Sequence, residues 1–167
     1  MPKIIENLRE QLLAEAKRQI DEHGYKNTTV RSVANGCGVA VGTVYNYFKS
    51  KDMLIASFIL ADWMECLGSI AQHPKDDRRA YLKFIHSSLC NFTYKHNALF
   101  SDKEAAKVFQ LSFSARHKQL RAQLAEQIMH IAKDGFLAEY VAEAMLCWTM
   151  AGRSFDEIYP LLPEKIK

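Results

Sequence analysis

The segment from Thr28 to Met53 constrains the fold of this chain more than any other, because two glycines within three residues interrupt a helical pattern. Gly36 and Gly38 flank Cys37, and each glycine costs about 1 kcal/mol relative to alanine in a helix interior. The chain must therefore turn there within a few residues. The sequence predicts two short helices joined by a tight turn.

The residues around this turn predict where three helices begin and end. Thr29 is expected to cap the second helix by accepting a hydrogen bond from the backbone N–H of Ser32. The third helix is expected from Val41 to Phe48, with Val44 and Phe48 facing inward. A first helix, ended by Gly24, is predicted from apolar residues at spacings of three and four, namely Ile5, Leu8, Leu12, Ala16 and Ile20.

Charge is distributed unevenly along the chain. Residues 1–51 hold eight Lys and Arg against five Asp and Glu, whereas residues 52–167 hold fourteen of each. From Gly24 to Lys51 there are four cations, Lys26, Arg31, Lys49 and Lys51, and no acidic residue. This asymmetry indicates a polyanionic partner.

The remainder of the chain, residues 51–167, is predicted to form a longer helical body. Apolar periodicity predicts helices over residues 51–72, 77–96, 115–133 and 138–155, with an aromatic-rich, less regular region at 98–113 and an irregular tail. We therefore expect an all-α protein with a three-helix head at residues 1–50 and a helical body at residues 51–167.

Short motifs follow one another at fixed offsets through the head, over about residues 4–54. They are Gly24-Tyr25, Thr28-Thr29, Val33-Ala34, Gly38-Val39, Gly42-Thr43-Val44-Tyr45, Tyr47-Phe48, Lys51 and Met53-Leu54. Their order resembles the DNA-binding domain of the TetR family of bacterial transcriptional regulators. Two positions depart from the family pattern: Ala40 stands where a Ser or similar cap is usual, and Tyr47 stands where His is frequent.

The resemblance implies a helix-turn-helix that reads double-stranded DNA as a homodimer on a palindromic operator. Phosphate contacts are expected from Thr29, Tyr45 and Lys51, and base contacts from the start and exposed face of the third helix. The dimer is expected to form through the last two helices, about residues 115–155, so that Gly152→Arg disrupts it. The DNA-facing residues are predicted to be Thr29, Arg31, Val41, Gly42, Thr43, Tyr45, Tyr47 and Lys51.

The body carries aromatic and polar side chains that suit an apolar ligand pocket. By resemblance to the family, a ligand there would shift the helix that begins at Lys51 and lower the affinity for the operator. The alternative is a packed core without a cavity, because aromatic stripes at helical spacing usually belong to cores. The predicted pocket residues are Trp63, Cys66, His86, Cys90, Tyr94, Phe109, Phe113 and Trp148.

The sequence indicates neither a metal site nor a catalytic constellation. Its four cysteines are widely spaced in apolar helical contexts and are expected to be free, buried thiols. His86 and Cys90 lie four residues apart without a third ligand at a helpful spacing, so helix packing is the preferred interpretation. We expect no cofactor and no membrane segment, and a cytoplasmic location.

These patterns favour a ligand-responsive, dimeric DNA-binding regulator, a repressor released by a small, largely apolar effector. One alternative keeps the DNA-binding head and gives the body to dimerisation or to a protein partner, without a small effector. A third hypothesis, a helical enzyme, is disfavoured because an acid, base and nucleophile constellation is missing.

Overall fold

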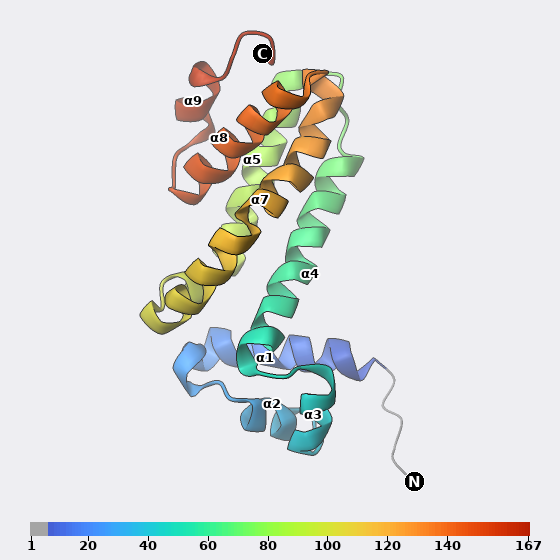
Figure 1. Ribbon diagram of the computed structural model, residues 1–167, viewed down its shortest axis with the longest axis vertical. Coiled ribbons are helices and arrows are strands. Elements are labelled where there is room, and N and C mark those ends of the chain that lie inside the picture. The colour runs from blue at the N-terminus through green and yellow to red at the C-terminus, as the bar shows by residue number, and fades with distance from the viewer. Residues whose placement is uncertain (1–6) are drawn as a thin grey trace. The chain divides into compact units, whose positions relative to one another are not determined.

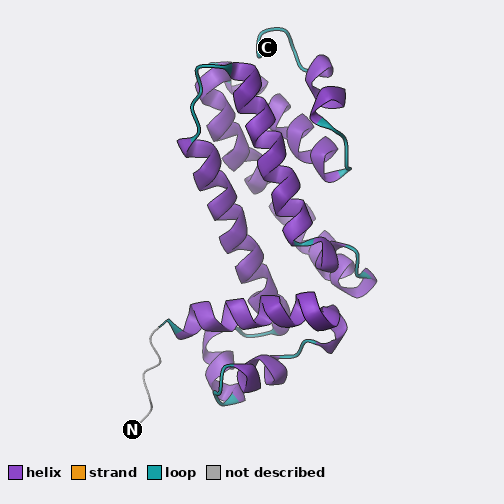
Figure 2. Ribbon diagram, turned by 180° about the vertical axis from the view of Figure 1, so that it is seen from behind, coloured by secondary structure: helices purple, strands orange, loops and turns teal. Residues whose placement is uncertain are grey.

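The computed structural model describes residues 7–167, except for the side chains of residues 107–115. The described chain contains helices and no strand, as the sequence predicts (Figures 1 and 2). The α-helices are α1 (Leu8–Asn27), α2 (Val30–Gly36), α3 (Val41–Tyr47), α4 (Lys51–Gln72), α5 (Arg78–Lys95), α6 (Asn97–Phe100), α7 (Lys103–Ala132), α8 (Gly135–Met150) and α9 (Phe155–Ile158), followed by the 3-10 helix η1 (Tyr159–Leu161).

Two compact units are formed from interleaved segments. The first contains the chain up to Asp62 together with residues 96–110, and the second contains residues 63–95 and 111–167. The chain passes from one unit to the other within α4 and again within α7. The predicted domain boundary after residue 50 coincides with the start of α4, inside the first unit, and it stays a prediction.

The first unit is organised around α1, which packs against α2 and α6, while α2 packs against α3 (Figure 1). Its helix–turn–helix segment is held by apolar side chains that follow the predicted inward pattern, since Val44 is fully buried and Phe48 is 2% exposed. The core of this unit comprises Leu8, Leu12, Leu13, Ala16, Ile20, Tyr25, Val30, Val33, Ala34, Val44, Phe48, Leu54, Ile55, Phe58, Leu99 and Ala105.

Gly24 interrupts α1 at the point where the sequence predicts the helix to end, although α1 continues beyond it to Asn27. Its φ of 76° lies in the left-handed region, which glycine adopts without the steric penalty of a Cβ. The bend carries Tyr25 into the core, and Thr28 closes the turn by donating from its hydroxyl to the Gly24 carbonyl oxygen at 3.0 Å. The chain therefore enters α2 from a fixed direction.

The second unit packs α5 against α8, and α8 against α9. The predicted inward residues of α5, Leu82, Ile85, Leu89 and Phe92, are all buried. On α7, Leu124, Ile128 and Ile131 are buried as predicted, whereas Leu120 is half-buried. The amphipathic periodicity thus predicts the core face of these helices correctly.

The boundary between α7 and α8 differs from the sequence prediction. The sequence predicts the next helix from residue 138, but α8 begins three residues earlier, at Gly135. Lys133 makes the turn before α8, with φ of 55°, and Asp134 caps α8 by accepting from the Leu137 N–H at 2.7 Å. Because the Asp134 carboxylate accepts a hydrogen bond from an otherwise unpaired N–H in the first turn, a helix start is favoured here over a helix end.

The end of α8 also differs from the prediction. The helix was expected to continue to Phe155, but it ends at Met150. Gly152 follows it with φ of 79°, and Ser154 then caps α9 in a reciprocal pair with Glu157. Part of the predicted irregular tail is therefore the short helices α9 and η1.

Within the described chain, α4 is the one helix whose length and apolar composition would suffice to cross a membrane, and a third of its apolar window is buried. Asp62 lies near its middle and forms an ion pair with Lys17 of α1 at 2.9 Å. His96, which is 2% exposed, places Nε2 3.1 Å from the same carboxylate. These partners embed α4 in the packing of the first unit.

Candidate nucleic-acid interface

The start of α2 is held by a reciprocal cap that the sequence predicts in part. Thr29 Oγ1 accepts from the Ser32 N–H at 3.0 Å, and Ser32 Oγ accepts from the Thr29 N–H at 2.9 Å. Gln19, buried on α1, donates to the Ser32 carbonyl oxygen at 3.0 Å. This network fixes the exposed N-terminus of α2, where backbone N–H groups favour an anion.

The two glycines lie at the turn between α2 and α3. Gly38 adopts φ of 65°, and the Val39 N–H donates to the Ala34 carbonyl oxygen at 3.0 Å. At Gly36, the end of the flexible Glu15 side chain from α1 occupies the space that a Cβ would take. The left-handed turn explains the glycine at position 38.

The third helix has no side-chain cap, as the departure at Ala40 predicts. Ala40 has the extended backbone of a capping residue, but its methyl group cannot accept a hydrogen bond. Val44 and Phe48 anchor the helix in the core, which leaves the side chains of Tyr45, Asn46 and Tyr47 exposed. A short helix fixed through one face presents its other face to a partner.

The eight residues predicted to face DNA lie at the start of α2, on α3 and at the start of α4, as the sequence predicts. Thr29, Arg31 and Gly42 are exposed, and Val41 and Thr43 are half-buried. Tyr45 is 45% exposed and Tyr47 is 46% exposed, which separates both from the core. The assignment of these residues to DNA stays a prediction.

Lys51 differs from the other predicted contacts because its ammonium already has a partner within the protein. Its Nζ donates to the Tyr25 carbonyl oxygen at 2.9 Å and lies 3.6 Å from the centroid of the Tyr25 ring. Burial lowers the pKa of Lys51, while Asp52 opposes that shift. An ammonium has three donors, so Lys51 can hold Tyr25 and still offer a proton to a phosphate.

The predicted pocket residues whose side chains are described range from the core to the surface, and their role in a pocket stays a prediction. Trp63 is 1% exposed, packs edge-on against Phe92 at 5.4 Å between ring centroids, and donates to Gln123 at 2.9 Å. Tyr94 is 83% exposed and Trp148 is 51% exposed, so neither is enclosed. The side chains of Phe109 and Phe113 lie outside the described residues.

The cysteine prediction is confirmed for pairing and wrong for burial. All four cysteines are free, but Cys90 and Cys147 are exposed, and Cys37 and Cys66 are half-buried. The neighbouring Leu89 and Leu146 are buried, whereas Cys90 and Cys147 themselves are exposed. Cys90 Sγ lies 3.7 Å from His86 Nδ1, as the predicted pairing on one helix face requires.

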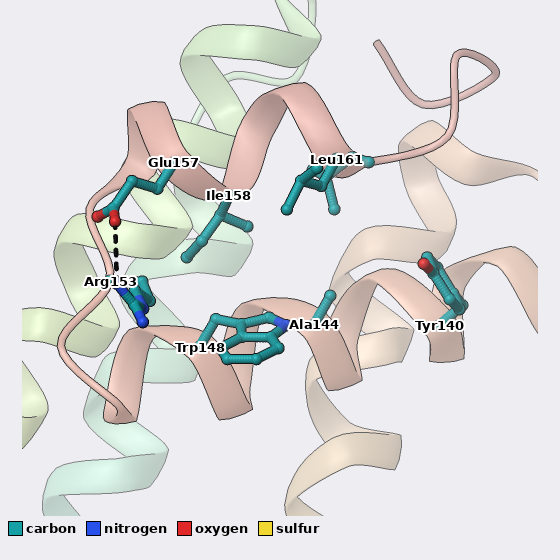
Figure 3. A pocket seen from close by; sticks show the side chains of 8 residues that line it. Tyr140, Ala144, Trp148, Arg153, Glu157, Ile158 and Leu161 are labelled. Carbon is teal, nitrogen blue, oxygen red and sulfur yellow. Dashed lines mark hydrogen bonds and ion pairs between the residues drawn. The ribbon is translucent and has the colours of Figure 1, made fainter.

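A hollow of about 380 Å³ lies between α8 and the segment formed by α9 and η1 (Figure 3). Trp148 lies along its floor, and an ion pair between Arg153 and Glu157, with nitrogen and oxygen 3.2 Å apart, lies at one end. Of the predicted pocket residues, Trp148 alone lines it. Tyr140, Ala144 and Trp148 are four residues apart in the sequence, and this spacing indicates that they share one face of α8. The lining is Tyr140, Ala144, Trp148, Arg153, Glu157, Ile158, Leu161 and Leu162.

Comparison with known proteins places the head in a described family. Residues 12–58 match the model for bacterial regulatory proteins of the tetR family. The fatty acid metabolism regulator protein of Bacillus subtilis (strain 168) is 32% identical over 135 residues, which are 77% of this chain and 66% of that protein. The transcriptional repressor KstR2 of Mycolicibacterium smegmatis is 36% identical over 59 residues, 35% of this chain and 28% of that protein.

Solved structures share the fold across nearly the whole chain. The fatty acid degradation regulator FadR from Bacillus halodurans superposes with a TM-score of 0.61 at 21% identity, over 96% of both chains. The regulator FadR from Bacillus subtilis, solved in complex with stearoyl-CoA, superposes with a TM-score of 0.57 at 20% identity, over 95% of this chain and 99% of that one.

The chain spans no more than 66% of the length of the two curated relatives described above. Those relatives are regulators, which agrees with the expectation that this chain is not an enzyme. The helix-turn-helix geometry, the matched residues and the shared helical fold lead to one conclusion: the chain belongs to the TetR family of bacterial transcriptional regulators.

Proposed function

We propose that this chain is a dimeric repressor that binds a palindromic operator through α3 and leaves it when a small, largely apolar effector binds the helical body. The observation that carries the DNA-binding part is the exposed, acid-free face of α3, held in place by buried Val44 and Phe48. A helix of this size enters the major groove, where base edges can be distinguished.

The exposed face of α8 supports the dimeric part of the proposal. Phe136, Tyr140, Ala144 and Trp148 follow one another at a spacing of four, which places them on one side of the helix. Phe136 is 82% exposed, and Tyr140 and Trp148 are about half exposed. Large aromatic side chains are enriched in protein interfaces, so this stripe suits contact with a second copy.

Binding of DNA is tested with two exposed tyrosines, Tyr47 in the first unit and Tyr94 in the second. An operator is first selected from random duplexes by the purified protein, and its affinity is then measured by fluorescence anisotropy. Tyr47→Ala should weaken operator binding roughly tenfold, which corresponds to about 1.4 kcal/mol, and change binding to unrelated DNA much less. Tyr94→Ala, on α5 in the second unit, is the matched control and should bind as wild type. Equal operator affinities of the two variants would contradict the assignment of α3.

The effector part of the proposal begins from a related regulator. Because the Bacillus subtilis FadR structure holds stearoyl-CoA, long-chain acyl-CoA thioesters form the first panel, with free fatty acids and coenzyme A as separate controls. An effector should raise the melting temperature and release the labelled operator over the same concentration range.

An alternative gives the helical body to dimerisation or to a protein partner, with no small effector. The close packing of Trp63 against Phe92 and its hydrogen bond to Gln123 favour this alternative, since a predicted pocket residue is occupied by core contacts. A ligand panel that neither raises the melting temperature nor releases the operator would support it.

A further inference from the structure

Three side chains with different metal-ligand chemistry converge on the second unit. His117 of α7 and Glu143 and Cys147 of α8 place their ligand atoms within 4.8 Å of one another. His117 Nε2 lies 2.9 Å from Glu143 Oε1, and Cys147 Sγ lies 3.2 Å from the same oxygen. One carboxylate oxygen therefore joins an imidazole and a thiol from two helices.

The sequence explains why these residues meet. Glu143 and Cys147 are four residues apart, so they share one face of α8 and lie one turn from each other. The short turn at Lys133 and Asp134 reverses the chain between α7 and α8, which brings His117 opposite them. Because the three residues come from two different helices, no local sequence motif reveals that they meet.

We propose that His117, Glu143 and Cys147 form a binding site for a divalent, thiolate-accepting cation such as Zn²⁺. Imidazole, carboxylate and thiolate are the ligands that Zn²⁺ takes in proteins, at about 2.0 to 2.3 Å each. Donor atoms in a tetrahedral shell then lie roughly 3.3 to 3.6 Å apart. The two measured separations are close to these values, so small side-chain rotations suffice. Cys147 is exposed, which leaves the fourth position open to water.

Binding replaces the two hydrogen bonds with metal bonds. The thiol of Cys147, which donates to Glu143, loses its proton to solvent as sulfur bonds the cation. The Nε2–H of His117 donates to Glu143 before binding, so this proton must also leave, either to Nδ1 of a neutral imidazole or to solvent from an imidazolium. The imidazole then carries its one proton on Nδ1 and offers the Nε2 lone pair to the cation. The charges of the thiolate and the Glu143 carboxylate together balance the dication.

Arg121 is the cationic neighbour of this cluster. Its Nη1 lies 3.6 Å from Glu143 Oε2, and its Nη2 lies 3.7 Å from Glu139 Oε2. The guanidinium thus approaches Oε2, which also lies 3.0 Å from His117 Nε2, while Oε1 faces both His117 and Cys147. It orients the carboxylate, in the manner of outer-shell partners that hold metal ligands.

His86 and Cys90 provide a matched control within the same unit. They are also a His and a Cys in contact, with 3.7 Å between Sγ and Nδ1, but both come from α5. Among the described residues, no third His, Cys, Asp or Glu joins them in a cluster of this kind. Two ligands from one helix should bind Zn²⁺ far more weakly than three.

The test uses the full chain after removal of metal with a chelator. Isothermal titration with Zn²⁺ should give one site per chain, and Co²⁺ should give a thiolate-to-cobalt charge-transfer absorption. Cys147→Ser should abolish that absorption, and both Cys147→Ser and His117→Gln should weaken Zn²⁺ binding at least tenfold. Cys90→Ser should leave the stoichiometry and the absorption unchanged.

Two outcomes would overturn the site. One is the absence of a stoichiometric Zn²⁺ site in the folded wild type. The other is a cobalt absorption that survives in Cys147→Ser and disappears in Cys90→Ser. Circular dichroism of each apo variant shows whether it is folded, and Glu143→Gln provides a second, near-isosteric variant that should also weaken binding if Cys147→Ser does not fold.

Discussion

Lys51 and Tyr25 are joined through two contacts, a 2.9 Å hydrogen bond from the ammonium to the backbone carbonyl and a 3.6 Å approach of Nζ to the ring centroid. The Tyr25 hydroxyl in turn donates to Asp52 at 2.6 Å. The first turn of α4 is therefore fastened to the segment that follows the bend at Gly24. A lysine predicted to contact phosphate also stabilises the fold of the head.

The first prediction separates these two roles of Lys51. Lys51→Ala should weaken binding to all DNA sequences and reduce the slope of log affinity against log salt by about one unit, because one phosphate contact is lost. It should also lower the free energy of unfolding by about 1 kcal/mol, because the contacts with Tyr25 are lost. Salt-dependent anisotropy and urea unfolding measure the two effects.

Tyr25→Phe is the control for the structural role of Lys51. It removes the bond to Asp52 but keeps the ring and the carbonyl oxygen that Lys51 contacts. It should lower stability and leave the salt slope unchanged. An unchanged salt slope in Lys51→Ala would remove Lys51 from the phosphate contacts.

The second prediction concerns the cap of α2. Thr29→Ala removes the acceptor of the Ser32 N–H, so stability should fall by about 1 kcal/mol. For a chain of this length that corresponds to a decrease of about 2–4 °C in melting temperature. Thr29→Ser keeps the hydroxyl and should remain close to wild type. Equal melting temperatures of the Ala and Ser variants would show that the cap contributes nothing measurable.

The third prediction is a gain of stability at Ala40. This residue already has the extended backbone of a capping residue, with φ of −68° and ψ of 145°, but it lacks an acceptor. Ala40→Ser supplies one for an exposed N–H of α3 and should raise the free energy of unfolding by about 1 kcal/mol. Asn35→Ser, an exposed change within α2, is the control for the added hydroxyl. A decrease in stability of Ala40→Ser would contradict this.

The sequence predicted the head in more detail than the body because its determinants are local. The cap at Thr29, the turn at Gly38 and the inward side chains of Val44 and Phe48 depend on neighbours within a few residues. The boundary between α7 and α8 was missed because both Lys133 and Gly135 can follow a helix, and the cap formed by Asp134 decides between them.

The missed sites in the body depend on contacts between distant residues. The carboxylate of Asp62 meets Lys17 and His96, and Glu143 meets His117, at sequence separations that periodicity does not reveal. Trp148 was predicted to line a pocket within the body, but its side chain is half exposed near the end of α8. Periodicity identifies an apolar face without stating which element, or which second molecule, covers it.

The fourth prediction is a loss of stability in acid that depends on Glu15. Hydrogen bonds from Arg18 lower the pKa of Glu15 to about 2; burial opposes this shift, and Gln19 adds to it. Because the folded pKa lies below the unfolded one, this contribution is present above about pH 4.5 and is lost as the pH falls toward 2. Glu15→Gln lacks the titrating group. Its stability deficit in urea should therefore be largest near neutral pH and shrink toward pH 2, whereas a constant deficit would contradict the role of ionisation.

The fifth prediction tests the proposed dimer at α8. Gly152→Arg is unsuitable, because Gly152 adopts φ of 79° and an arginine there would strain the backbone even in a monomer. Trp148→Glu instead places a charge at the C-terminal end of the aromatic stripe, where a dimer would bury it without a partner. Sedimentation should shift from dimer to monomer, and operator affinity should fall at least tenfold while affinity for a single half-site is retained.

Tyr94→Glu is the matched control for this test, because Tyr94 is 83% exposed on α5 of the same unit and lies outside the stripe. It should sediment as wild type. If Trp148→Glu also remains a dimer, the interface lies on another face, and Phe136→Glu at the opposite end of the stripe then decides whether any part of α8 contributes. Dimers in both α8 variants would exclude this helix, whereas a monomer in Phe136→Glu alone would place the contact at its N-terminal end.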